Sequence, residues 1–274
     1  DSRKGGYGKI NVMDAIRLSS NTGVVKIIDS VYNKKSKKFV DRLYNFGIAK
    51  PVISSIKGEP NPIIPHPNDE SWNGLSMPWM TYGYGVKMTP IQILTFYNSI
   101  ANDGEVVKPK FIHSTRKFGT NENKVYPKQI LNKSIFSNYT NKVLKKMLYD
   151  VVHHQNGTAK NIKSKYLKLS GKTGTTQVDY ITDTINYISS FVGYFPSDKP
   201  KYSCIIVLNK PNKSKGFYGN KVAAPVFKRI AEKIFSKYPK VEEYDLNELN
   251  ENIRFSKIEI ENSSSDNKIV SNGT

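Results

Sequence analysis

The segment "LSGKTGTTQ", from Leu169 to Gln177, combines a lysine, several threonine hydroxyls and two glycines in a short polar run. Two kinds of chemistry use such residues. In a phosphate-binding loop of pattern G-x-x-x-x-G-K-[S/T], backbone N–H groups at the start of a helix hold phosphate oxygens. In an acyl-transfer site, a strand can present a fixed positive charge and hydroxyl groups along the edge of the cleft.

The phosphate-binding interpretation fails on spacing and on context. The loop pattern needs a glycine where this chain has Tyr166, and strand-like rather than helical sequence follows. The segment is therefore predicted to be a strand. In an acyl-transfer site, Lys172 would face a substrate carboxylate, which the hydroxyls of Thr173 and Thr175 can also bind. Gly174 would leave room for a substrate backbone, although an ordinary edge strand with a glycine bulge explains the same residues.

A second polar triplet, Ser19-Ser20-Asn21, lies between two segments of helical periodicity. The hydroxyl of Ser19 can pass protons, and the amide of Asn21 can bind a substrate carbonyl. Serine and asparagine are also favoured at the N-terminus of a helix, where they cap its free N–H groups. Taken alone, the triplet is compatible with either role.

Helical periodicity and capping residues predict the elements that position these groups. A helix capped by Asn11 runs into the Ser19 triplet and resumes as "VVKIIDSVY". Further helices are predicted from a cap at Ser36 to Gly47, from Thr89-Pro90 to Gly104, over 138–153 and over 222–238. Residues 51–78 are rich in Pro, Asn, Gly and Ser, which indicates a long irregular connection.

Three β-rich runs follow one another in the last third of the chain: "YLKLSGKTGTTQ", "NYISSFVGYF" and "YSCIIVLN". Their short separations predict an antiparallel meander. Helices followed by a meander and a closing helix indicate an α+β fold, with an antiparallel sheet flanked by helices. Residues 239–274 are acidic, then rich in Ser and Asn, and are expected to form a poorly ordered polar tail.

Composition excludes several classes of site. The net charge is +19, but lysines occur in nearly every segment and no aromatic-plus-basic recognition motif is present, so we expect no nucleic-acid partner. The single cysteine, Cys204, excludes an internal disulfide. The four histidines lack metal-binding spacing, so no metal is expected; they are His66, His113, His153 and His154. No apolar run approaches the length of a bilayer span.

The two triplets occur in the order of the second and third motifs of the set S-x-x-K, S-x-N and K-T-G. The sequence around them resembles the transpeptidase domain of class B penicillin-binding proteins, and most of all the division-type members that crosslink septal peptidoglycan. The resemblance covers Gly5 to about Tyr238. It is carried by "RKGGYGKI" with "AIRLSSNTGVVKI", "YGYGVKMTPIQILTFYNSIANDGEVVKP", "NGTAKN" with "LSGKTGTTQ", "FVGYFPSDKPKYSCIIVLNKP" and "VAAPVFKRIAEKI".

The resemblance implies a serine D,D-transpeptidase without metal or cofactor. Such an enzyme attacks the D-Ala-D-Ala end of a peptidoglycan stem peptide, releases the last D-Ala and passes the acyl group to an amine of a neighbouring strand. β-Lactams acylate the same serine. Catalytic roles would fall to Ser19, Asn21 and Lys172, and substrate binding to Thr173, Gly174 and Thr175. Expected partners are stem peptides, β-lactams and divisome membrane proteins, on the outer face of the bacterial inner membrane.

The first motif of the set departs from the family order. No S-x-x-K precedes Ser19, and the three later matches begin at Ser54, Ser114 and Ser265. We interpret these as chance matches and expect the acylating serine, the N-terminal domain and a membrane anchor upstream of Asp1. Residues 1–238 would then be the C-terminal part of the transpeptidase domain, with exposed apolar surface. Carboxypeptidase or β-lactamase chemistry on the same fold, or a non-catalytic module that binds the divisome or a membrane surface, are the alternatives.

Overall fold

The computed structural model describes residues 5–52, 57–178 and 185–237. The chain divides into two compact units, Asp1–Glu232 and Lys233–Thr274. Of the second unit only 233–237 are described, so the predicted tail and the serine at 265 lie outside the described residues, as does the serine at 54 in the first unit. No helix in the described part of the chain has the length and hydrophobicity needed to cross a bilayer.

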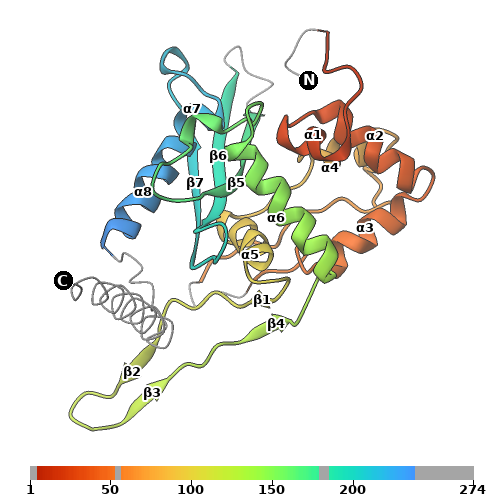
Figure 1. Cartoon of the computed structure of the whole chain (residues 1–274). Coiled ribbons are helices and arrows are strands. Elements are labelled where there is room, and N and C mark those ends of the chain that lie inside the picture. Colours follow the sequence, from red (N-terminus) through yellow and green to blue (C-terminus); the bar gives the residue numbers. More distant parts are fainter. Residues whose placement is uncertain (1–4, 53–56, 179–184, 238–274) are drawn as a thin grey trace, which may run out of the picture. The chain divides into compact units, whose positions relative to one another are not determined.

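The predicted meander is confirmed. Strands β5 (Ser170–Val178), β6 (Asn186–Phe195) and β7 (Tyr202–Asn209) form an antiparallel sheet in the order β5-β6-β7. The strand that carries the K-T-G residues is therefore an edge strand, with Lys172 opposite Val192 and Gly174 opposite Ser190. One edge of β5 pairs with β6, and its other edge faces the first two helices of the chain (Figure 1).

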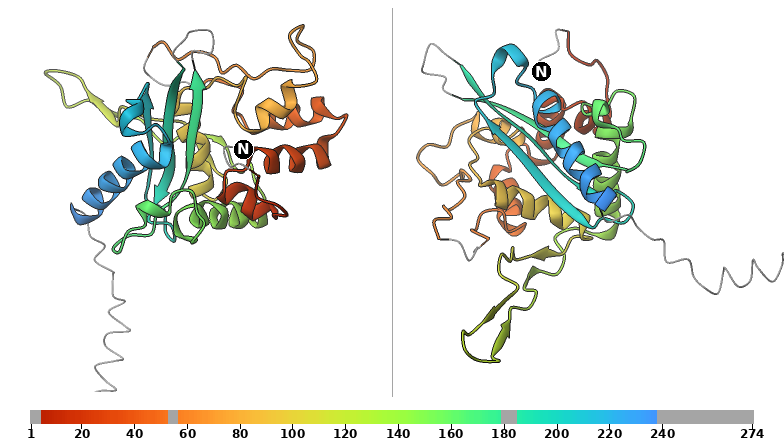
Figure 2. Two further views of the ribbon diagram at one scale, coloured as in Figure 1. Left: turned by 90° about the horizontal axis from the view of Figure 1, so that it is seen from above. Right: turned by 90° about the vertical axis from the view of Figure 1, so that its left-hand side faces the viewer.

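Helices lie on both faces of this sheet (Figures 1 and 2). Alternate side chains of β6 point to opposite faces. Phe191 and Phe195 contact Phe227 of helix α8 (Ala224–Lys237), whereas Tyr194 packs with Ile100 and other residues of the opposite layer. That layer consists of α5 (Pro90–Ala101) and α6 (Asn138–His153). The central strand β6 thus lies between two helical layers.

The remaining helices precede α5 in the chain or are short helices that flank the strands of the sheet. They are α1 (Val12–Arg17), α2 (Asn21–Tyr32), α3 (Ser36–Asn45), α4 (Ser76–Thr81), α7 (Gly219–Val222), and the short 3-10 helices η1 (Lys160–Ile162) and η2 (Lys213–Lys215). The predicted caps at Asn11 and Thr89 are confirmed, each as a capping box. The predicted cap at Ser36 is wrong: Ser36 is the first helical residue, and the N-cap, Lys35, makes no side-chain cap bond.

Two short strand pairs between α5 and α6 were not predicted. Strand β1 (Val106–Val107) pairs with β4 (Ile130–Asn132), and β2 (Ser114–Arg116) pairs with β3 (Asn123–Val125). Strands of two or three residues are too short to show a period of two, and β2, β3 and β4 are exposed throughout. The pairs form an arm that extends from the base of α5 (Figure 1).

Candidate active site

The structure brings the two polar triplets into contact. Lys172 Nζ on β5 donates a hydrogen bond to Ser19 Oγ in the turn between α1 and α2, across 153 positions of sequence. A second bond joins Lys172 Nζ to the carbonyl oxygen of Thr173 at 3.2 Å. The residue pair chosen from the sequence for catalysis is therefore adjacent in space.

In the turn between α1 and α2, the helix cap is Ser20 and not Ser19. Ser20 is the N-cap of α2, where its side chain is buried and accepts a hydrogen bond from the Gly23 N–H at 3.1 Å. Ser19 has a φ of 53°, a left-handed conformation that is uncommon outside glycine. Its N–H bonds to the Ile16 carbonyl at 3.2 Å, so the backbone holds its side chain outside the helix. Asn21 is the exposed first residue of α2.

Burial changes the acidity of the lysine. It lowers the pKa of the Lys172 amine from its ordinary value of 10.5 to about 8, because the charged form loses hydration in this position. The amine is still mostly protonated at pH 7 and donates to Ser19. A small shift in pH or a nearby proton transfer is then enough to make Lys172 a proton acceptor, which is the property that a relay needs.

The three residues after Lys172 make contacts on several sides. Thr173 Oγ1 lies 3.4 Å from Thr158 Oγ1, and Thr175 Oγ1 accepts a bond from the Gly219 N–H at 3.0 Å. A Cβ on Gly174 would lie 2.4 Å from Ser190 Oγ, so a side chain at position 174 would require the Ser190 hydroxyl to rotate away. The absence of a side chain at Gly174 thus leaves room for the Ser190 hydroxyl on the neighbouring strand.

Two contacting residues, Thr158 and Gly219, were not assigned as site residues from the sequence. Thr158 belongs to "NGTAKN", and Gly219 begins α7. A Cβ on Gly219 would lie 2.5 Å from the Gly174 carbonyl oxygen, a backbone atom that cannot rotate away, so a glycine is required at position 219. Lone threonines and glycines carry no chemical signature, and only the tertiary contacts reveal them.

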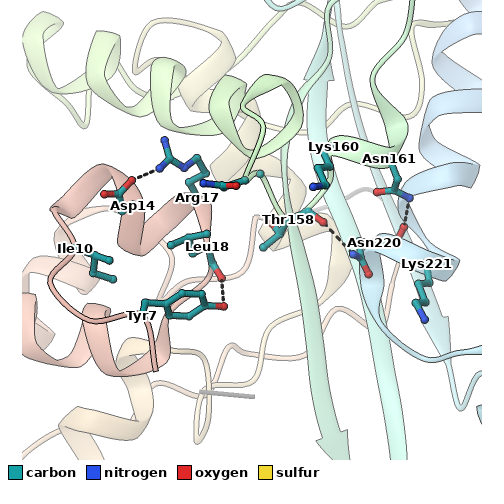
Figure 3. Close-up of a pocket in the computed structure, with 12 residues that line it drawn as sticks. Tyr7, Ile10, Asp14, Arg17, Leu18, Thr158, Lys160, Asn161, Asn220 and Lys221 are labelled. Atoms are coloured by element: carbon teal, nitrogen blue, oxygen red, sulfur yellow. Dashed lines mark hydrogen bonds and ion pairs between the residues drawn. The ribbon is translucent and has the colours of Figure 1, made fainter. Parts of the chain in front are cut away.

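A cavity of about 810 Å³ opens beside this cluster. Figure 3 shows α1 on one side of it and the 156–161 segment with α7 on the other. Thr158 links the cavity to β5, and Arg17, Lys160 and Lys221 give it positive charge, partly offset by the ion pair of Arg17 with Asp14. Among the described residues no group of three His, Cys, Asp or Glu gathers to hold a metal. The positive charge of the lining therefore favours an anionic ligand over a cationic one.

The other titratable and serine candidates lie elsewhere. His153 stacks on Tyr149 and its Nε2 lies 3.1 Å from the Leu169 carbonyl oxygen; burial lowers the pKa of its imidazole. It thus supports the start of β5. Ser114 is in β2, on the arm that points away from β5 (Figure 1), so it does not provide a nucleophile next to Lys172.

Comparison with known proteins identifies the family. The model of the penicillin binding protein transpeptidase domain matches residues 1–232. The chain belongs to this family. It is 29% identical to the peptidoglycan D,D-transpeptidase FtsI of Buchnera aphidicola over 82% of this chain, and 30% identical to the penicillin-binding protein PbpB of Mycolicibacterium smegmatis over 78%. These matches confirm the resemblance to division-type class B penicillin-binding proteins.

The fold of the family is confirmed as well. Penicillin binding protein 3 from Mycobacterium tuberculosis, solved in complex with aztreonam, superposes with a TM-score of 0.74 at 25% identity, covering 87% of this chain and 54% of that one. Penicillin-binding protein 2B from Streptococcus pneumoniae superposes with a TM-score of 0.72 at 19% identity. The matched region is 37% of the length of the Buchnera relative and 33% of that of PbpB, so the chain spans about a third of these proteins.

Proposed function

We propose that this chain supplies the second and third motifs of the active site of a peptidoglycan D,D-transpeptidase. The observation that carries the proposal is the hydrogen bond between Lys172 Nζ and Ser19 Oγ. The two residues belong to separate elements and come together at an edge strand, as the motif order S-x-N then K-T-G requires. The acylating serine is contributed by a segment outside these residues.

The chemistry has two steps. The serine Oγ attacks the carbonyl carbon of the penultimate D-Ala; its proton passes to the leaving amine, and the last D-Ala departs. An amine of a second stem peptide then attacks the acyl-serine and restores the hydroxyl. Ser19 and Lys172 form the relay for these protons, since a hydroxyl both donates and accepts and the Lys172 pKa of about 8 lies near neutral pH.

The substrate carboxylate binds next to β5. Thr175 Oγ1 already accepts a bond from the Gly219 N–H, which leaves its own hydroxyl proton free to donate to a carboxylate. The Thr173 hydroxyl and the positive charge of Lys172 also bind the carboxylate. The side-chain amide of Asn21 donates a hydrogen bond to a substrate carbonyl oxygen. The Thr175 backbone N–H, with that of the acylating serine, stabilises the oxyanion.

We further propose a role in septal wall synthesis at division, on the outer face of the inner membrane, with divisome membrane proteins as partners. β-Lactams would acylate the serine. Water could replace the acceptor amine, which would give carboxypeptidase or β-lactamase-type hydrolysis on the same residues. A chain without the serine would instead be a docking module of the divisome.

Fluorescent penicillin tests the proposal. The gene is first read in frame upstream of Asp1, and the polypeptide that joins any S-x-x-K segment to these residues is labelled. We expect labelling that drops at least 100-fold in Lys172→Met and Ser19→Ala, because each removes a member of the proton relay. Ser164→Ala, at a position bonded to Glu232 away from the cluster, should label normally. Absence of labelling at any serine would reject the catalytic role.

A further inference from the structure

The arm, residues 106–133, is the most exposed part of the described chain. Its base is the β1–β4 pair, and its end is the β2–β3 hairpin (Figure 1). Phe118, in the turn of this hairpin, is 102% exposed, so its ring contacts nothing. Phe111, Ile112 and Val125 are each about half exposed. The fully exposed Phe118 ring stabilises nothing within the chain, which indicates contact with something else.

The arm is also strongly basic. It has seven basic residues, Lys108, Lys110, Arg116, Lys117, Lys124, Lys128 and Lys133, against one acidic residue, Glu122. Over the whole chain the ratio is 42 to 23. A codon bias toward lysine spreads charge evenly, so it does not explain an excess of seven to one within the arm.

Most of this charge is not cancelled at the tip. Arg116 bonds to the Thr120 carbonyl and the Asn121 side chain, which are neutral acceptors. Lys124 lies 5.4 Å from the centre of the Tyr126 ring. Lys117 pairs with Glu122 only at 3.7 Å, with both side chains more than two-thirds exposed, and such pairs are weak. The exposed phenylalanine is thus surrounded by available positive charge.

We propose that the arm docks on an anionic lipid bilayer, with Phe118 inserted among the head groups and Arg116 and Lys117 bound to lipid phosphates. Interfacial protein segments combine the same two features, an apolar side chain at the boundary of the acyl region and basic residues at the head groups. A soluble polyanion would use the basic residues but would leave Phe118 in water. The lipid surface is the occupant that uses both.

Vesicle binding of the full chain tests this inference, which does not depend on the catalytic proposal. Vesicles of phosphatidylcholine alone are compared with vesicles that also contain phosphatidylglycerol. We expect binding to the anionic vesicles only, weakened about 25-fold by Arg116→Gln with Lys117→Gln, since each basic residue near such a surface contributes about a factor of five. Phe118→Ser should weaken it about tenfold through lost apolar burial.

Matched variants separate docking by the arm from diffuse attraction by a basic protein. Lys34→Gln with Lys35→Gln removes the same charge at exposed positions between α2 and α3, and Tyr166→Ser removes an aromatic ring that is 76% exposed. Both should change binding less than about twofold. Equal losses in these controls and in the arm variants would overturn the proposal.

Insertion is read directly from tryptophan emission. Phe118→Trp should shift to the blue on anionic vesicles and be quenched by brominated acyl chains, after subtraction of the signal from Trp72 and Trp79. Tyr166→Trp should do neither. The lipid proposal is wrong if the emission of the tryptophan at position 118 stays at the wavelength of a water-exposed indole. It is also wrong if heparin competes fully while Phe118→Ser binds vesicles normally, because the arm would then bind polyanions through charge alone.

Discussion

The amine of Lys172 should lose its proton near pH 8, where an ordinary lysine does so near 10.5. At pH 7 about one molecule in ten then carries a neutral amine, compared with about one in 3,000 for an ordinary lysine, a difference of roughly 300-fold. As the pH rises through 8, the neutral form becomes the majority, and Nζ can accept the proton of the Ser19 hydroxyl instead of donating to its oxygen. The sign follows from burial, which penalises the charged form.

This titration can be measured in the chain as it stands. With lysine labelled by ¹³C at Cε, the chemical shift of each side chain is followed from about pH 6 to about pH 11, a range that covers both values. One signal should titrate near 8 and disappear in Lys172→Arg. Lys168→Arg, at an exposed position just before β5, should leave that signal unchanged.

The cause of the low pKa is tested in the same experiment. Because burial and not the bond to Ser19 lowers the pKa, Ser19→Ala should leave it well below 10.5. A signal assigned to Lys172 that titrates near 10.5 would refute the reasoning, since the amine would then be hydrated and the proposed relay would lack a neutral base near pH 7. A return to about 10.5 in Ser19→Ala alone would show that the Ser19 side chain is what keeps water from the amine, since the hydrogen bond to its oxygen by itself favours the charged form.

Three further predictions concern the elements around the site. Ser20→Ala should speed hydrogen exchange of the first amides of α2 about fivefold, because a lost N-cap costs about 1 kcal/mol, whereas Ser19→Ala should not. Gly193→Ala should abolish soluble expression, since its Cβ would lie 2.0 Å from the Ser170 carbonyl oxygen, while Gly74→Ala, with nothing within 4 Å, should be silent. The chain should bind a dye for exposed apolar surface, because α2 has no buried residue; a monodisperse, cooperatively melting monomer that binds none would contradict this.

The sequence was most informative where local and tertiary signals agree. The capping box at Thr89, with Pro90 behind it, forms a complete local signal, and α5 begins there. Strands β5, β6 and β7 are eight to ten residues long, long enough for their composition to be recognised. The prediction that Ser36 caps α3 was wrong although serine is a common capping residue. The N-cap is Lys35, one residue earlier, and the helix begins without a side-chain cap.

The candidate site likewise has a part that the sequence predicts and a part that it does not. Its motif residues could be named from the order of the two triplets, but the cap and catalytic interpretations of Ser19-Ser20-Asn21 could not be separated, because Ser and Asn suit both. The structure assigns the cap to Ser20 and brings Ser19, for which we propose the catalytic role, into contact with Lys172. Thr158 and Gly219 depend on contacts across 15 and 44 positions, which no local pattern contains.

This division of labour explains why the turn has two serines. The cap at Ser20 holds the start of α2, and the left-handed φ of Ser19 then directs its hydroxyl toward β5. A left-handed conformation costs a non-glycine residue about 1 kcal/mol or more, and the fixed bonds of the turn to α1 offset that cost. The proposed proton relay would thus be positioned by the backbone before any substrate binds, which is the arrangement that makes proton transfer efficient. A glycine at position 19 would relax the backbone and lose the hydroxyl, so strain and function are tied to the same side chain.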